Sequence, residues 1–524
     1  MGASVDEVVG VKIRHRRGLE MYLSGVKTLA IGADGWTTAQ VWEAANRPED
    51  VVLGDSARDA IRAAHRVVLE HCASGEAVYG VNTGFGDLAS VPIASEDLAE
   101  LQRRLLVSHA CGVGDPVPER VVRTMLLLKV VGLCRGHSGV AEATVDRLLL
   151  LLTRGALPVV PSQGSLGASG DLAPLSHLVL PLIGVGDVMV GGERRAAQDV
   201  LAGWGLEPLV LGPKEGLALI NGTQLMGAYG VESARRMHRI ALAADALAAL
   251  SLEAWHGRSE PFSEAIHRVR PHPGAAESAR VVRSWLAGSR QQTEPRTQVQ
   301  DPYSFRCVPQ VHGASRDVLA HALTVLDREL QGVTDNPLVF PETGEILSGG
   351  NFHGQPLALT LEAMALATHE WASISERRTF KLLAGRQGLP PFLAAEPGLN
   401  SGLMIPQYTA ASLVSQNKQL CTPAAADTID SSNGQEDHVS MGANSALKLW
   451  RILDNAEQVL AIECLTAAQA LDLRGRDGMA PALHALHASF RHRVPFLRED
   501  AFLAPHLASA LDWLRTEADW NPPT

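Results

Sequence analysis

Four glycine-rich segments interrupt an otherwise helical sequence, and they hold the side chains best placed for chemistry. They are residues 79–86, 162–170, 348–354 and 431–435. Catalytic residues usually lie on loops carried by a rigid scaffold. The most unusual of the four places Ala168, Ser169 and Gly170 among other small residues, directly before Asp171. Asp171 is expected to cap the helix that follows, and the small residues let the backbone approach itself closely.

The string from Gly164 to His177 resembles a segment of the aromatic amino acid ammonia-lyase and aminomutase family, and the likeness extends from about residue 79 to residue 473. Members of this family cyclise an internal Ala-Ser-Gly into an electrophilic methylidene-imidazolone (MIO) group. The resemblance implies that Ala168, Ser169 and Gly170 form this group. Attack of the Gly170 nitrogen on the Ala168 carbonyl needs a tight fold-back, which small residues permit. Loss of water then leaves a methylene on Ser169, so no external cofactor is expected.

Further motifs match the family and supply the expected catalytic groups. Tyr79 heads a glycine-rich loop similar to the one that carries the family's catalytic tyrosine. The β-proton of an amino acid is weakly acidic, and a phenolate near positive charge can serve as the base that removes it. Asn221 is expected to contact the amino acid part of the substrate and the MIO group. Phe352 is expected to lie beside the reacting centre.

A third motif, at residues 300–307, is expected to bind the carboxylate end of the substrate. The resemblance assigns substrate binding to Gln300 and Arg306, and it places the catalytic Tyr303 near the MIO group. Arginine suits a carboxylate because its planar guanidinium can donate two parallel hydrogen bonds.

Two positions bear on the side chain of the substrate. Ser108 and His109 stand where the family places its ring-selectivity pair, and they match the histidine ammonia-lyase form, although some tyrosine aminomutases share it. Glu436 stands where phenylalanine and tyrosine enzymes usually carry glutamine. A carboxylate can hold an imidazole by a charge-assisted hydrogen bond, but it would be unfavourable beside a phenyl ring.

The expected reaction is therefore the conversion of L-histidine to trans-urocanate and ammonia. A tyrosine or phenylalanine ammonia-lyase or 2,3-aminomutase is the alternative, and a catalytically silent helical scaffold is a more remote one.

The composition of the chain argues against several other classes of protein. The chain has 524 residues, 46% of them apolar and 20% charged, with a formal net charge of −11. Without a long basic run, binding to nucleic acid or to an anionic membrane is not expected. No apolar stretch reaches the roughly 20 residues needed to span a bilayer. Six scattered cysteines favour free thiols in a reducing, cytoplasmic compartment. The histidines at 484, 487 and 492 lack the further ligands of a metal site.

The elements that must position these residues are mainly helices. Apolar residues recur at helical spacing from Leu449 to Leu460, and residues 231–255 and 357–383 also read as long helices, which predicts a bundle. Short hairpins are predicted at residues 188–192 and 338–347, with no parallel sheet. We expect a flexible tail at residues 1–26, a MIO-bearing region at 27–215 and a long-helix bundle at 216–524. The resemblance implies the ammonia-lyase (fumarase/aspartase-like) fold, assembled as a homotetramer with shared active sites.

Overall fold

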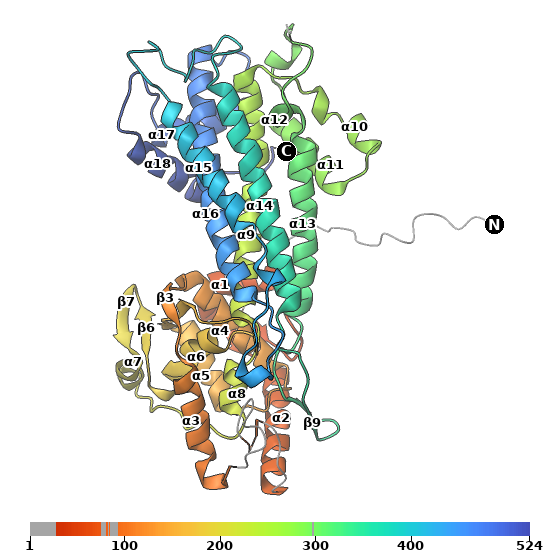
Figure 1. The fold of residues 1–524 in the computed structure, drawn as a ribbon, viewed down its shortest axis with the longest axis vertical. Coiled ribbons are helices and arrows are strands. Elements are labelled where there is room, and N and C mark those ends of the chain that lie inside the picture. Colours follow the sequence, from red (N-terminus) through yellow and green to blue (C-terminus); the bar gives the residue numbers. More distant parts are fainter. Residues whose placement is uncertain (1–27, 75–79, 82, 84–92, 296–297, 524) are drawn as a thin grey trace, which may run out of the picture.

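The computed structural model describes residues 28–74, 80–81, 83, 93–295 and 298–523. The molecule is elongated and mainly helical, as predicted, with a lower part of short helices and strands and a tall bundle of long helices (Figure 1). The elements before the bundle are β1 (Leu29–Ile31), α1 (Thr38–Asn46), β2 (Val51–Leu53), α2 (Asp55–Ser74), α3 (Leu98–His109), β3 (Val113–Pro116), α4 (Glu119–Cys134), α5 (Glu142–Thr153), β4 (Leu157–Pro158), β5 (Pro161–Gln163), α6 (Leu172–Val179), β6 (Asp187–Val190), β7 (Glu193–Ala196), α7 (Ala197–Gly203) and α8 (Glu215–Ile220).

The bundle follows, and its helices run side by side along the long axis of the molecule. The remaining elements are α9 (Gln224–Trp255), α10 (Glu264–Arg268), α11 (Pro273–Trp285), α12 (Tyr303–Arg306), α13 (Val308–Glu329), β8 (Leu338–Phe340), β9 (Glu345–Leu347), α14 (Gln355–Leu382), α15 (Met404–Leu420), α16 (Gly442–Arg474), α17 (Pro481–Arg493) and α18 (Leu503–Thr516).

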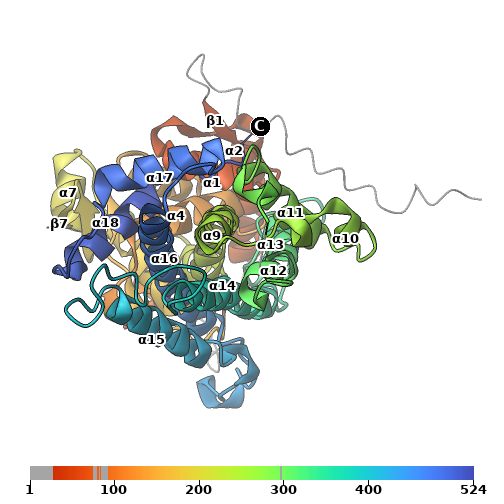
Figure 2. The same cartoon turned by 90° about the horizontal axis from the view of Figure 1, so that it is seen from above.

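Helix α9 is the axis of the bundle, with α11, α13, α14 and α16 around it (Figure 2). Its side chains are buried on nearly every face, as expected of a helix surrounded by other helices. Its 32 residues, at 1.5 Å per residue, span about 48 Å. The long helices predicted at residues 231–255, 357–383 and around 449–460 are confirmed as parts of α9, α14 and α16.

Both predicted hairpins are present. β6 and β7 pair across Gly191 and Gly192, which adopt φ values of 58° and 84°, and β8 pairs with β9 in antiparallel register. The expectation of no parallel strands was wrong in one place, because β1 and β2 pair in parallel. Helix α1 lies between them and forms the crossover that parallel neighbours require.

The predicted boundary between residues 215 and 216 falls at the first turn of α8. The predicted tail, residues 1–26, lies outside the described residues, and the division of the chain into these regions stays a prediction. Within the described part of the chain, no helix combines the length and the apolar character needed to cross a membrane.

Candidate active site

Ala168 and Ser169 occupy the two central positions of a tight turn. Gly167 and Gly170 flank the turn and pair with each other in antiparallel fashion. Their φ values are 82° and 77°, and a Cβ on Gly170 would lie 2.1 Å from the backbone oxygen of Gly222. Only glycine fits that position. The chain therefore folds back where the proposed ring closure requires it, and the residues present fit a cyclised Ala-Ser-Gly.

Two segments distant in the sequence hold the turn from either side. The backbone N–H of Gly222 donates to the Ser169 carbonyl at 3.3 Å, and the Gly222 carbonyl accepts from the N–H of Asp171 at 2.8 Å. The N–H of Met441 donates to the Leu166 carbonyl at 3.0 Å. Met441 also begins helix α16 with a left-handed backbone, at φ 52°. The starts of α9 and α16 thus support the same turn.

Asp171 has a different role from the expected one. It precedes α6, but its side chain makes no capping bond to that helix. Its Oδ2 instead accepts from the N–H groups of Leu225 and Met226, at 2.9 and 3.1 Å, in the first turn of α9. A carboxylate suits this place because the amino end of a helix carries partial positive charge. Burial raises the pKa of Asp171 to about 7, although these amides and Lys129 oppose the shift.

Asn221 lies directly before Gly222 and is held by a buried polar cluster. Its Nδ2 donates to the Asn336 carbonyl at 2.7 Å and to Asp335 Oδ1 at 3.4 Å. Asp335 Oδ2 also forms an ion pair with Nζ of the buried Lys214, at 2.8 Å. Within the described residues, Asn221 Oδ1 is buried and has no partner. Asn221 therefore keeps one unsatisfied acceptor next to the turn.

His109 is the last residue of α3, and one of its ring nitrogens has no hydrogen bond to the residues that the structure describes. Its Nδ1 lies 2.8 Å from the Leu105 carbonyl and 3.0 Å from Ser108 Oγ. A carbonyl only accepts, so the neutral ring carries its proton on Nδ1 and leaves Nε2 as an acceptor. Burial lowers the pKa of His109, while the Leu105 carbonyl and the Glu436 carboxylate raise it. Glu436 is thus close enough to His109 to act on its charge.

The loops that carry Phe352 and Glu436 lie against each other. Residue 353 follows Phe352 and residue 438 comes two after Glu436; both are histidines, and their rings stack at 5.9 Å with an interplanar angle of 10°. His353 Nε2 lies 3.2 Å from the His438 carbonyl. These contacts and the Met441–Leu166 bond bring Ala168, Ser169, Gly170, Asn221, His109, Phe352 and Glu436 into one region at the start of α9.

Gln300, Tyr303 and Arg306 lie at the opposite end of the bundle. Phe305, in α12, stacks on Trp255, the last residue of α9, with ring centroids 5.2 Å apart. The Asp171 carboxylate binds the first turn of the same helix, so about 48 Å of helix separates the two groups. The Arg306 guanidinium lies 4.6 Å above the ring of Tyr303, which is 70% exposed. A single chain does not bring these three residues to the turn, and Tyr79 lies outside the described residues.

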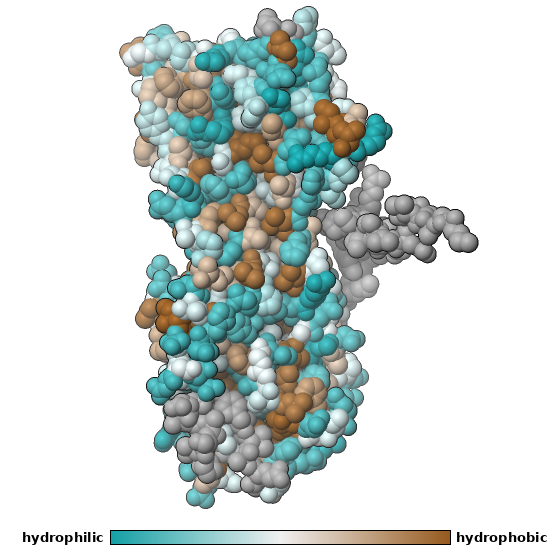
Figure 3. All heavy atoms as spheres, turned by 45° about the vertical axis from the view of Figure 1, so that its right-hand side comes forward, coloured by the Kyte–Doolittle hydropathy of each residue, from teal (hydrophilic) through white to brown (hydrophobic). Residues whose placement is uncertain are grey.

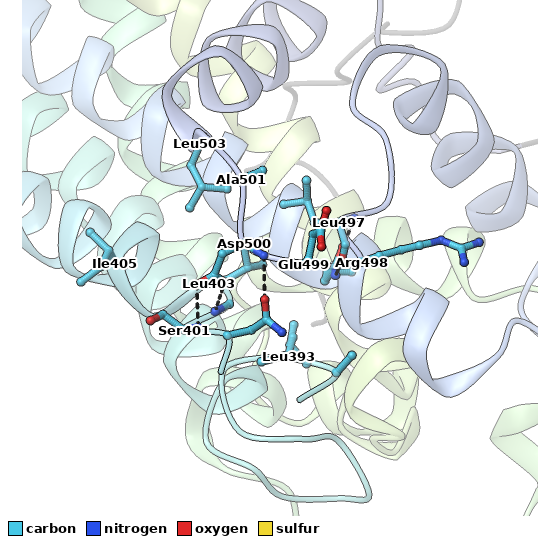
Figure 4. A pocket seen from close by; sticks show the side chains of 15 residues that line it. Leu393, Ser401, Leu403, Ile405, Leu497, Arg498, Glu499, Asp500, Ala501 and Leu503 are labelled. Carbon is cyan, nitrogen blue, oxygen red and sulfur yellow. Dashed lines mark hydrogen bonds between the residues drawn. The ribbon is translucent and has the colours of Figure 1, made fainter. Parts of the chain in front are cut away.

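A cavity of about 190 Å³ lies elsewhere, between residues 393–405 and 497–503 (Figure 4). One of its two carboxylates is already engaged, because Asp500 accepts from the backbone N–H groups of Ser401 and Gly402 at 2.8 Å each. None of the predicted site residues that the structure describes lines this cavity. It is separate from the candidate active site.

The sequence reasoning missed the buried charges behind the turn: Lys129, Lys214 and Asp335. Lys129 carried a usable signal, since it interrupts the apolar run from Leu126 to Val131 in a helix buried on most faces. A charge in such a run is rarely buried without a specific partner. Asp335 carried no such signal, because its side-chain partners, Lys214 and Asn221, lie more than a hundred positions away in the sequence.

The sequence and the fold have close counterparts among known proteins. The profile of the aromatic amino acid lyase family matches residues 36–492. A histidine ammonia-lyase of Deinococcus radiodurans is 52% identical over 467 residues, 88% of each chain. A solved histidine ammonia-lyase from Trypanosoma cruzi is 39% identical with a TM-score of 0.86, over 93% of both chains.

A tyrosine aminomutase from Streptomyces globisporus is 35% identical with a TM-score of 0.88, over 93% of this chain and 96% of that one. The chain belongs to the aromatic amino acid lyase family. It is a carbon–nitrogen lyase, as the sequence resemblance predicted.

Proposed function

We propose that this enzyme deaminates L-histidine non-oxidatively to trans-urocanate and ammonia, with a MIO group formed from Ala168, Ser169 and Gly170 as its electrophile. Relatives named histidine ammonia-lyase, 44 to 52% identical over most of the chain, support this reaction. The observation that carries the proposal is that the Glu436 carboxylate lies close enough to act on the charge of His109, whose Nδ1 is held by the Leu105 carbonyl.

A carboxylate and an imidazole in the same region suit an imidazole substrate better than a phenyl ring. Glu436 is a carboxylate that accepts from Ser431 Oγ at 3.0 Å and keeps further acceptor capacity. His109 offers Nε2 as a second acceptor. An imidazole supplies N–H donors to such a site, whereas an apolar ring leaves the acceptors without partners, which is unfavourable in a partly buried site.

The remaining roles are those that the family resemblance implies, and the chemistry of each side chain suits them. Arg306 holds the substrate carboxylate and Asn221 accepts from the amino end. The MIO group, once formed, supplies the electrophile that engages the substrate amine. Tyr79 takes the β-proton, and the electrons of the broken C–H bond form the new double bond as the C–N bond breaks. The products balance without an oxidant, as an elimination requires.

The assembly we propose is a homotetramer in which each site is shared between chains. Arg306 and the turn lie at opposite ends of α9, so a second copy must supply α12 to each turn. Leu359, Leu366 and Phe380 on α14 are 59%, 52% and 44% exposed, at spacings of seven and fourteen residues, which places them along one face. Apolar patches are visible over the bundle (Figure 3), and such patches mark interaction surfaces.

We place the enzyme in the cytoplasm and expect no external cofactor, no metal and no nucleic acid or membrane partner. All six cysteines are free thiols in the structure, which suits a reducing compartment.

A tyrosine-specific lyase or 2,3-aminomutase is the second candidate, favoured by the Ser108–His109 pair and by the likeness to a tyrosine aminomutase. Incubating the purified enzyme separately with L-histidine, L-tyrosine and L-phenylalanine, and identifying the products by mass and NMR, tests the assignment. We expect urocanate from histidine at the highest kcat/KM. A faster tyrosine or phenylalanine reaction, or a β-amino acid as the main product, would overturn it. Absence of near-ultraviolet absorption from a cyclised group would indicate a silent scaffold.

A further inference from the structure

Lys129 is buried directly behind the turn that carries Ala168 and Ser169. It lies in α4 and is 2% exposed. Its Nζ donates to two backbone carbonyls, of Asn221 at 2.7 Å and of Ala218 at 3.2 Å. No carboxylate lies within ion-pair distance of it among the residues that the structure describes. Burial lowers the pKa of Lys129 to about 7, although the Asp335 and Asp171 carboxylates oppose the shift. Methionine would fill the same space without the cost of burying an ammonium.

The two carbonyls that Lys129 binds belong to the end of α8. Carbonyl groups at the last turn of a helix lack intrahelical partners and carry partial negative charge. A lysine there donates the missing hydrogen bonds and offsets that charge. The opposite end of α8 begins at Lys214, which is also buried and pairs with Asp335. Asp335 in turn contacts Asn221 Nδ2. Buried lysines therefore fix α8 at both ends, and Lys129 fixes the end that leads to Gly222.

Gly222 is the residue that touches the turn. It donates to the Ser169 carbonyl and accepts from the Asp171 N–H, and it pairs in parallel with Gly170. The peptide whose oxygen Lys129 holds is the one that joins Asn221 to Gly222. A shift of that peptide would move the N–H of Gly222, and with it the carbonyl of Ser169.

We propose that Lys129 is a positioning residue for MIO formation: it holds the Asn221–Gly222 peptide so that the turn at Ala168–Ser169 stays folded for cyclisation. This inference rests on the proposed function and adds a residue that acts through the backbone without touching the reacting atoms.

The covalent step needs only correct placement. The Gly170 nitrogen bonds to the Ala168 carbonyl carbon, and that oxygen leaves as water with the amide hydrogens of Ser169 and Gly170. A second water takes the Ser169 hydroxyl and its α-hydrogen. No oxidant or reductant enters, so geometry is the requirement that a positioning residue can meet.

The test is the intact mass of newly synthesised protein, followed over time in the soluble, assembled fraction. Wild type should become lighter than its sequence mass by two water molecules. In Lys129→Met, which keeps the length of the side chain and removes its donors, the cyclisation rate should fall at least about tenfold, the value of one charge-assisted hydrogen bond. Lys129→Arg keeps the donors and should restore much of the rate.

Lys448→Met is the matched control. Lys448 is another partly buried lysine, 3.0 Å from both oxygens of Glu362 in the bundle, and it makes no contact with the turn. It should cyclise at the wild-type rate. If Lys129→Met does not fold, Lys129→Gln, which retains a shorter neutral donor, replaces it and should also cyclise slowly.

Full cyclisation of the Lys129 variant at the wild-type rate would overturn the inference, as would an equal loss in Lys448→Met. A wild-type chain that keeps its full sequence mass would instead overturn the proposed function itself. The two failures are therefore distinguishable in one experiment.

Discussion

The Ser169 hydroxyl leaves in the second of the two water molecules that MIO formation releases, and alanine has no such group. Ser169→Ala should therefore fold normally, lose at most the one water molecule of ring closure and lose histidine turnover almost completely. Mass spectrometry and urocanate absorbance check the two expectations together. Full turnover by a Ser169→Ala protein would show that the electrophile is not built there. The flanking glycines should hold the turn in this variant, because alanine fits wherever serine does.

Glu436→Gln tests how the ring is recognised. The substitution keeps the size of the side chain and removes its charge, weakening a charge-assisted hydrogen bond of roughly 1.5–3 kcal/mol. The kcat/KM for histidine should fall by about one to two decades. Turnover of tyrosine or phenylalanine should fall less or rise, because no carboxylate then faces the ring.

The quantity to measure is the ratio of kcat/KM for histidine to kcat/KM for tyrosine or phenylalanine, since this ratio does not depend on the amount of active protein. An equal fall for all three amino acids would remove Glu436 from ring recognition.

His109 should make stability depend on pH in a defined window. Burial lowers its pKa below the ordinary value. As the pH falls through about 6.5, the unfolded chain takes up a proton that the folded site resists, so the folded state loses stability. His109→Gln does not titrate and lacks this loss. As the pH falls from about 7 to about 5, the thermal midpoint of wild type should therefore fall more than the thermal midpoint of His109→Gln. A difference that is constant over this range would contradict the burial of His109.

At the scale of single residues, the sequence was informative where chemistry constrains residue type. Ala168, Ser169, Gly170, Asn221, His109, Phe352 and Glu436 come from five separate segments, and the fold brings them together. The role of Asp171 was mistaken because helix-capping rules look to the nearest helix, whereas its partners are the amides of α9. Helix-capping rules use only residues that are close in the sequence, so they cannot identify partners more than fifty residues away.

At the scale of elements, the turn at Ala168–Ser169 requires glycine at position 170 for two reasons: a positive φ and the close approach of Gly222. Gly170 and Gly192 both have positive φ, 77° and 84°, but a Cβ on Gly192 would meet nothing within 4 Å. Gly192→Ala, in the β6–β7 hairpin, should lose about 1–2 kcal/mol from backbone strain alone. Gly170→Ala adds a clash with Gly222 worth roughly a further 1–3 kcal/mol.

Chemical unfolding and intact mass should separate the two variants. Gly192→Ala should be mildly destabilised and fully cyclised, whereas Gly170→Ala should be strongly destabilised and uncyclised. Equal behaviour would mean that the close approach of Gly222 is not important.

Long helices and short hairpins were predictable because their signals are local. Apolar spacing identifies α9, α14 and α16, and Gly191–Gly192 identifies a hairpin. The parallel pair β1–β2 was missed because each strand has only three residues, and the partners are set by the crossover through α1. Three residues are too few to show a period.

At the scale of the whole molecule, shared sites predict complementation. A Ser169→Ala chain still carries α12, and an Arg306→Met chain still carries the turn. Each variant alone should be almost inactive. Co-expressed as mixed oligomers, they should recover activity in up to about one quarter of the sites under random assembly. Two separately purified and unmixed oligomers serve as the control, and the absence of recovery after co-assembly would place both halves of the site on one chain.

The length of α9 has a further consequence in that assembly. Its first turn supports the turn of one site, and its last residue supports α12, which serves a different site. Each α9 helix therefore supports parts of two different active sites. A folded chain with a distorted α9 would impair sites that contain normal residues from its neighbours. Such a variant should act as a dominant inhibitor in mixed oligomers, lowering activity by more than its share of the chains.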